Sequence, residues 1–138
     1  MKRGFSFAAA VLGLLAAGVP LVAHHASAAG NDTSKTVTIK GVITQVEWQN
    51  PHLEFYIDVK NQDGKVTNWH IDFPSPNVLT ERGMTKQTLH AGDQVSVEIW
   101  AAKNGSPNGN GRLLTLPDGR SISGESRWDH ILSTSSAR

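Results

Sequence analysis

The chain has 138 residues, no cysteine and a formal net charge of +1, with 13 basic and 12 acidic residues. Without cysteine it forms neither disulfides nor thiolate nucleophiles. Any metal site would therefore need histidine and carboxylate ligands.

Residues 1–23 have the layout of a secretory signal peptide. Lys2 and Arg3 precede the apolar run FSFAAAVLGLLAAGV, and small residues follow it. The run is about 15 residues long, shorter than the roughly 18 that a membrane-spanning helix needs. We therefore expect an exported protein, periplasmic or secreted, without a membrane span after cleavage.

The cleavage site has two candidate positions. Cleavage after Ala23 would leave His24 at the mature N-terminus, whereas cleavage after Ala28 would remove both His24 and His25. The small, polar residues of 24–35 predict a disordered N-terminal segment.

Removal of the leader changes the charge balance. Without Lys2 and Arg3, 11 basic residues stand against 12 acidic ones, a net charge of −1. A near-neutral domain has no electrostatic footprint for phosphate backbones, so we expect no nucleic-acid partner.

The stretch TVTIKGVITQVEW predicts a long first strand, because it is dense in β-branched residues. Its apolar positions change parity, since Val37 and Ile39 are odd-numbered and Val42 is even. We expect a β-bulge at Gly41, because glycine tolerates the left-handed conformation that lets a strand gain a residue.

Two alternating strands follow. In residues 53–59 and 69–73 the odd-numbered side chains are apolar, and nearly all the even-numbered ones are polar. This is the period of half-buried strands that share one core.

The register of this hairpin follows from parity, because paired residues must share a face and their numbers must sum to an even number. A three-residue loop that ends at a left-handed Gly64 satisfies the condition. Tyr56 is then predicted opposite His70, and Glu54 opposite Asp72.

The second half of the chain predicts a short helix and two strands. Ser75 and Pro76 suit a cap and first turn, and Gly83 suits the end. DQVSVEIWA alternates, GRLLTLPDGRSIS predicts a last strand with a turn, and KNGSPNGNG between them predicts an exposed, mobile loop.

The predicted elements are three strands, a short helix and two further strands, and the first strand is long and bent. This order is typical of an all-β, OB-fold-like five-stranded barrel. We place this barrel at residues 36–124, followed by a flexible tail at 125–138.

Several segments together resemble a bacterial family of small exported proteins classed as a domain of unknown function. They are HH near the leader, KGVITQVEWQNPHLEFYIDVKNQDGKVTNW, SPNVLTERGMTKQTLHAGDQVSVE and LPDGR, across about residues 24–120. NPH, DGKVTNW and LPDGR are the most specific pieces. The resemblance implies a small β-barrel in the periplasm or outside the cell, and no known activity. The segment AAGNDTSK departs from the family pattern, because it is more polar than usual.

The polar face of the second and third strands is where such barrels usually bind ligands. Tyr56 and an outward Trp100 would add stacking platforms for a sugar ring or a peptide side chain. We expect a monomeric binding module that takes a small molecule, a saccharide or a protein and requires no cofactor. The predicted ligand-binding face consists of His52, Glu54, Tyr56, Asp58, Asn68, His70, Asp72 and Trp100.

The alternative hypothesis is zinc or copper binding. His52 and His70 are suitable ligand types, and Glu54 or Asp72 could complete a three-ligand cluster across the two strands. The predicted metal-binding histidines are His52 and His70, with His24 and His25 added if cleavage leaves them in the mature protein.

A plainer interpretation is that His70 packs across Tyr56 while His52 orders the start of its strand. Glu54 and Asp72 are opposed carboxylates of the kind that glycoside hydrolysis uses. On an open face, however, we expect solvated acids whose pKa values are little perturbed. Since the sequence also has no nucleophile motif or phosphate loop, we predict no enzymatic activity and no catalytic residue.

Overall fold

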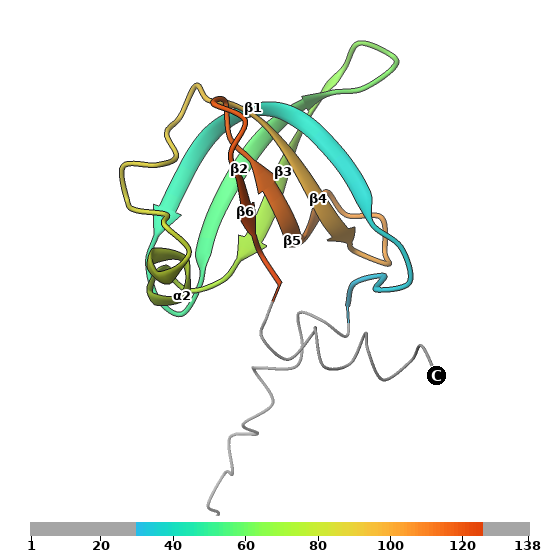
Figure 1. Cartoon of the computed structure of the whole chain (residues 1–138). Coiled ribbons are helices and arrows are strands. Elements are labelled where there is room, and N and C mark those ends of the chain that lie inside the picture. The colour runs from blue at the N-terminus through green and yellow to red at the C-terminus, as the bar shows by residue number, and fades with distance from the viewer. Residues whose placement is uncertain (1–29, 126–138) are drawn as a thin grey trace, which may run out of the picture.

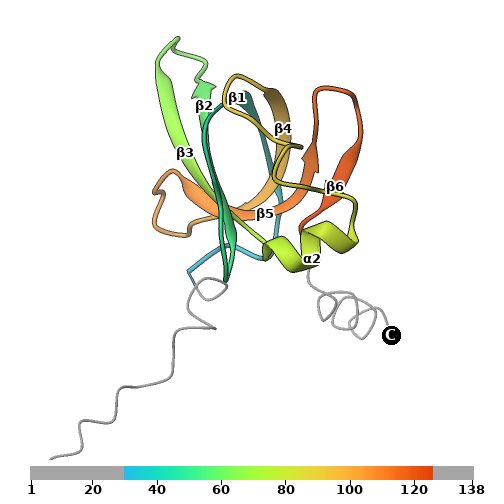
Figure 2. The same ribbon diagram turned by 90° about the vertical axis from the view of Figure 1, so that its left-hand side faces the viewer.

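The computed structural model describes residues 30–125 of the chain. Their strands wrap into a closed barrel, and helix α2 lies at one end of it (Figures 1 and 2). The elements in chain order are β1 (Val37–Trp48), β2 (Leu53–Lys60), β3 (Val66–Phe73), α2 (Pro76–Glu81), β4 (Gln94–Ala101), β5 (Asn108–Thr115) and β6 (Ser121–Ser123).

The sheet closes because β3 pairs with β5 in parallel, while β1 pairs with both β2 and β4, and β4 pairs with β5. The ring order β1-β2-β3-β5-β4 confirms the predicted OB-fold-like five-stranded barrel. Strand β6 is an addition to the prediction, a short strand that pairs with the end of β5 after the LPDGR turn.

The core fills the barrel with side chains from every strand. Within it, Phe55 and Phe73 meet edge to face, with ring centroids 5.8 Å apart and planes at 73°. Trp48 and Trp69 are partly buried against this core. The buried hydrophobic residues are Ile39, Ile43, Leu53, Phe55, Ile57, Ile71, Phe73, Leu79, Met84, Leu89, Val95, Val97, Ile99, Leu114, Leu116 and Ile122.

The bend of β1 has a different origin from the one predicted. The register with β2 shifts between Ile43 and Gln45, so the bulge lies at Thr44 and the prediction of a bulge at Gly41 is wrong. Gly41 instead lets the backbone of β1 lie close to the backbone of β2. A Cβ there would fall on the carbonyl oxygen of Asp58, so only glycine fits between the strands.

The β2–β3 hairpin confirms the register derived from parity. Tyr56 pairs with His70 and Glu54 with Asp72. The loop ends at Gly64 with φ +83°, the left-handed conformation that its turn requires.

Helix α2 also begins where the sequence predicted. The side chain of Ser75 accepts a hydrogen bond from the backbone N–H of Val78, and Gly83 follows the helix with φ +82°. Arg82 then donates to the backbone carbonyls of Ser123 and, at 2.7 Å, of Glu125. The end of the described chain is thereby held against the helix.

Two segments predicted to be loose belong to the barrel. Strand β5 begins at Asn108, inside the stretch predicted as an exposed loop. Within the stretch predicted as disordered, Asn31 forms a β-bridge with Ala102 and is only 5% exposed.

No helix between residues 30 and 125 is long and apolar enough to span a membrane. The predicted signal peptide, His24, His25 and most of the predicted C-terminal tail lie outside the described residues.

Candidate functional site

Two histidine–carboxylate pairs cross from β2 to β3 on the outer face of the barrel. His52 Nδ1 lies 3.0 Å from Asp72 Oδ1, and His70 Nε2 lies 2.8 Å from Glu54 Oε2. Since Glu54 and Asp72 are themselves paired in the register, the two contacts run diagonally beside each other. Each imidazole has one nitrogen engaged by a carboxylate, which orients the ring.

The neighbouring predicted residues make cross-strand contacts as well. The rings of Tyr56 and His70 are stacked, with centroids 4.8 Å apart and planes at 14°. The side-chain amide of Asn68 donates to Asp58 Oδ1 at 2.8 Å and to Thr44 Oγ1 at 3.1 Å. The structure therefore brings the seven predicted residues of β2, β3 and the turn before β2 onto one surface.

Trp100 joins this surface through β5, because Asn110 lies opposite Asp72 on one side and Trp100 on the other. The guanidinium carbon of Arg112 lies 3.6 Å from the centroid of the Trp100 ring. One face of Trp100 is thus covered by Arg112, as one face of Tyr56 is covered by His70. Each expected stacking platform has at most one face left for a ligand.

Asp72 is the carboxyl group of this face whose pKa is raised. Burial is the main cause of the rise above 3.8; His52 then lowers the pKa, Glu54 raises it and His70 lowers it. The expectation of little-perturbed, solvated acids is therefore wrong for Asp72. Its Oδ1 is buried and has no aligned hydrogen bond, although His52 Nδ1 is 3.0 Å away. The two side chains are thus in close contact, but they are poorly aligned for a hydrogen bond.

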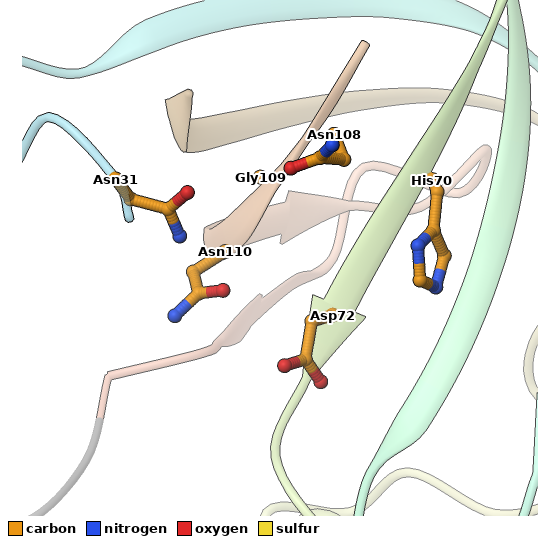
Figure 3. Close-up of a pocket in the computed structure, with 6 residues that line it drawn as sticks. All are labelled: Asn31, His70, Asp72, Asn108, Gly109 and Asn110. Atoms are coloured by element: carbon orange, nitrogen blue, oxygen red, sulfur yellow. The ribbon is translucent and has the colours of Figure 1, made fainter. Parts of the chain in front are cut away.

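Beside Asp72 lies a hollow of about 190 Å³. Its walls come from the N-terminal segment, from β3 and from the start of β5. Figure 3 shows three carboxamides and the Asp72 carboxyl group arranged around this space. The lining residues are Asn31, His70, Asp72, Asn108, Gly109 and Asn110.

Sequence reasoning missed the three asparagines of this hollow. The sequence predicts a loop at 108–111, because asparagine and glycine are poor strand formers. Its strict alternation was the signal available, since Gly109 and Gly111 are buried and the asparagines face out. A Cβ at Gly111 would lie 2.5 Å from Phe73 Cδ2, so the barrel closes tightly there.

The predicted three-ligand metal cluster does not form in the described part of the chain. Within residues 30–125 no group of three or more histidine, cysteine, aspartate or glutamate side chains is placed to hold a metal ion. His52 and His70 each contact a carboxylate instead.

A second, more open hollow of about 600 Å³ lies on a different part of the barrel. It is lined by β1, β4 and the end of β5, including Lys40, Val42 and Thr115. It contains no carboxylate or imidazole side chain, so its chemistry differs from that of the hollow beside Asp72.

Two solved structures resemble this barrel, both of the mitochondrial single-stranded DNA binding protein Rim1 from S. cerevisiae. The first is 18% identical, has a TM-score of 0.46 and covers 59% of this chain and 92% of its own. The second, selenomethionine-labelled, is 17% identical, has a TM-score of 0.44 and covers 66% and 97%. No curated protein gives a significant match.

These neighbours correct one prediction. Net charge led us to exclude nucleic acid as a partner, and we withdraw that exclusion, since both similar structures are of single-stranded DNA binding proteins. At this identity the likeness concerns the fold alone.

The resemblance drawn from the motifs NPH, DGKVTNW and LPDGR is confirmed at the level of the family. A family model described as a family of unknown function, DUF6152, matches residues 10–111, about three quarters of the chain. The chain therefore belongs to the family of unknown function DUF6152.

Proposed function

We propose that this chain is an exported, non-enzymatic binding module. Its ligand-binding surface would be the outer face of β2, β3 and the first half of β5. The observation that carries the proposal is the hollow beside Asp72, where side chains from three separate segments surround one space. Rigid strands hold two of its three walls, an arrangement suited to recognition.

The contacts among the acids favour binding over catalysis. Glu54 is engaged by His70, and Asp72 lies against His52. Both pairs lie on the outer face of the barrel, and water reaches His52, Glu54 and His70 there and competes with acid–base chemistry. The proposed export rests on the signal-peptide layout of residues 1–23.

The surface can be tested by nuclear magnetic resonance on ¹⁵N-labelled protein, purified as the cell processes it. The probes are methyl glucoside, N-acetylglucosamine, triglycine and N-acetyl-arginine amide. We expect at least one probe to shift the amide signals of residues 52–58, 68–72 and 108–110 together. Shifts confined to the hollow around Lys40 and Thr115 would refute the proposed surface.

Zinc or copper binding is the second candidate. One observation favours it: a carboxylate orients one nitrogen of each imidazole in His52 and His70, as occurs around metal-binding histidines. His24 or His25 would have to supply further ligands. Calorimetry with Zn²⁺ and Cu²⁺ on metal-free protein should give heat that His52→Ala and His70→Ala both remove. Absence of heat, or heat that both variants retain, would reject this candidate.

A further inference from the structure

Three carboxamides around the hollow have no partner for their side chains in the described part of the chain. Asn31, Asn108 and Asn110 line the space beside Asp72, and the side-chain hydrogen bonds between residues 30 and 125 involve none of the three asparagines. Each carboxamide carries an acceptor oxygen and a donor nitrogen. A ligand entering this space would find several hydrogen-bonding groups uncommitted.

Asn31 is the most informative of the three, because it is only 5% exposed. Backbone hydrogen bonds hold its neighbours in place: Asp32 N–H donates to Ala101 at 2.9 Å and Lys103 N–H donates to Gly30 at 2.9 Å. Figure 3 shows its carboxamide turned toward Asn108 and Asn110. This amide has no side-chain partner among residues 30–125 and lines the hollow, so a ligand there can bond to it.

The carboxylates nearest the hollow lie in a row across the strands. Cross-strand pairing sets Glu47 next to Glu54 and Glu54 next to Asp72, a row of three carboxylates. Glu47 accepts hydrogen bonds from the side-chain amides of Gln45 and Gln49. Between residues 30 and 125, no lysine or arginine lies within ion-pair distance of these three acids.

Cross-strand carboxylates repel one another when no cation separates them. The groups that act electrostatically on Asp72 are His52, Glu54 and His70. A cation held in the hollow would bring an opposite charge to Asp72 and so relieve the repulsion with Glu54.

From the unpartnered carboxamides and this row of acids, we propose that the hollow binds a guanidinium group. Asp72 forms a charge-assisted pair with it, and the carboxamide oxygens of Asn31, Asn108 and Asn110 accept its remaining N–H groups. A planar guanidinium presents five N–H donors, which matches an acceptor-rich space with one carboxylate. The inference rests on the proposed function and specifies the ligand class of the same surface.

Other ligand classes fit the hollow less well. An anion would face Asp72 and the neighbouring Glu54, a like-charge contact. A neutral sugar would find hydrogen-bonding groups, but it would leave the carboxylate row uncompensated. An ammonium group carries only three donors on a strongly hydrated point charge, fewer than the acceptors around the space.

The test compares N-acetyl-arginine amide with N-acetyl-citrulline amide, in which a neutral urea group replaces the guanidinium at nearly the same shape. Both are titrated into ¹⁵N-labelled protein. We expect the arginine compound to shift the side-chain amide signals of Asn31, Asn108 and Asn110, and the citrulline compound to bind at least about tenfold more weakly. Agmatine and the peptide Gly-Arg-Gly, run in parallel, show whether a free cation or a peptide side chain binds better.

Two variants locate the contact. Asp72→Asn keeps the shape of the side chain and removes its charge, so it should weaken arginine binding about tenfold or more. Glu81→Gln on α2 removes the same charge outside the hollow and should leave the affinity within about twofold. Asn31→Ala should also weaken binding, and dispersed spectra of all variants would establish that they are folded.

Equal binding of the arginine and citrulline compounds, or no binding of either, would overturn the guanidinium assignment. An unchanged affinity in Asp72→Asn would overturn it too. If a neutral sugar shifts the β2–β3–β5 face while the arginine compound does not, the proposed binding surface stands and this inference fails. If shifts appear only around Lys40 and Thr115, both fail.

Discussion

Tyr56 and His70 lie directly opposite each other on β2 and β3, and their rings stack with centroids 4.8 Å apart. The same His70 ring contacts Glu54 through Nε2 and lines the hollow beside Asp72. One imidazole therefore links the aromatic contact, the carboxylate pairs and the proposed binding space. Its position depends on the hairpin register, because a one-residue slip would turn His70 into the core.

Gly64 sets that register, and its replacement should weaken the hairpin. Gly64→Val forces a β-branched residue into φ +83°, and we expect a loss of about 1–2 kcal/mol in the free energy of unfolding. Urea denaturation measures it. Gln62→Val changes an exposed residue of the same loop and serves as control, with an expected effect below about 0.5 kcal/mol. Equal losses in the two variants would contradict the conformational explanation.

Gly41 should be intolerant of substitution for a different reason. A Cβ at this position would fall on the carbonyl oxygen of Asp58 and lie 2.7 Å from Ile57 Cγ2. Because the clashing atoms belong to the backbone of β2, they cannot move aside without disturbing the strand pairing. Gly41→Ala should therefore lower the free energy of unfolding by about 2–3 kcal/mol through overpacking.

The matched control for Gly41→Ala is Gly119→Ala, where φ is +86° but open space surrounds the site. That variant should lose only about 1 kcal/mol, from backbone strain alone. Thermal unfolding of both variants ranks the two effects. A smaller loss at Gly41 than at Gly119 would show that β1 and β2 separate more easily than the structure implies.

The stability contribution of Asp72 should depend on pH. Because burial raises its pKa in the folded state, the charged form opposes folding, and stability falls as pH rises above 3.8 through the raised pKa. Asp72→Asn removes this loss. Relative to the parent protein, the variant should therefore gain stability between acid and neutral pH.

Denaturation of both proteins at several pH values measures that difference. His52 lowers the Asp72 pKa, so His52→Ala is the control that removes this partner. With His52 absent, the opposing effect on the Asp72 pKa disappears, and the pH-dependent gain from Asp72→Asn should increase. A difference that does not change with pH would contradict burial as the main cause.

The predicted leader can be checked directly by mass spectrometry of the protein recovered from cells. The expected mature chain begins at His24 or at Ala29, after cleavage at one of the two small-residue sites. The first outcome leaves two adjacent histidines available to a metal, and the second removes them. Recovery of a chain that still begins at Met1 in the membrane fraction would refute the proposed export of a soluble module.

Short-range chemistry determined much of this protein from its sequence. Strict alternation in residues 53–59 decided which side chains of β2 face the core, because successive residues of a strand point to opposite faces. Parity then determined that Tyr56 lies opposite His70. Ser75, Pro76 and Gly83 bounded the helix, since caps and stops depend on neighbouring backbone groups.

The tertiary structure alone decided where the barrel closes and which residues line the hollow. The stretch Asn108–Gly111 becomes a strand only because its glycines let β5 approach Phe73 and pair with β3. Asn31 becomes buried only because its backbone bridges to Ala102 across the chain. Contacts between residues so distant in sequence depend on how the closed barrel packs. Local propensity cannot predict them, because it reflects only the neighbouring residues in the sequence.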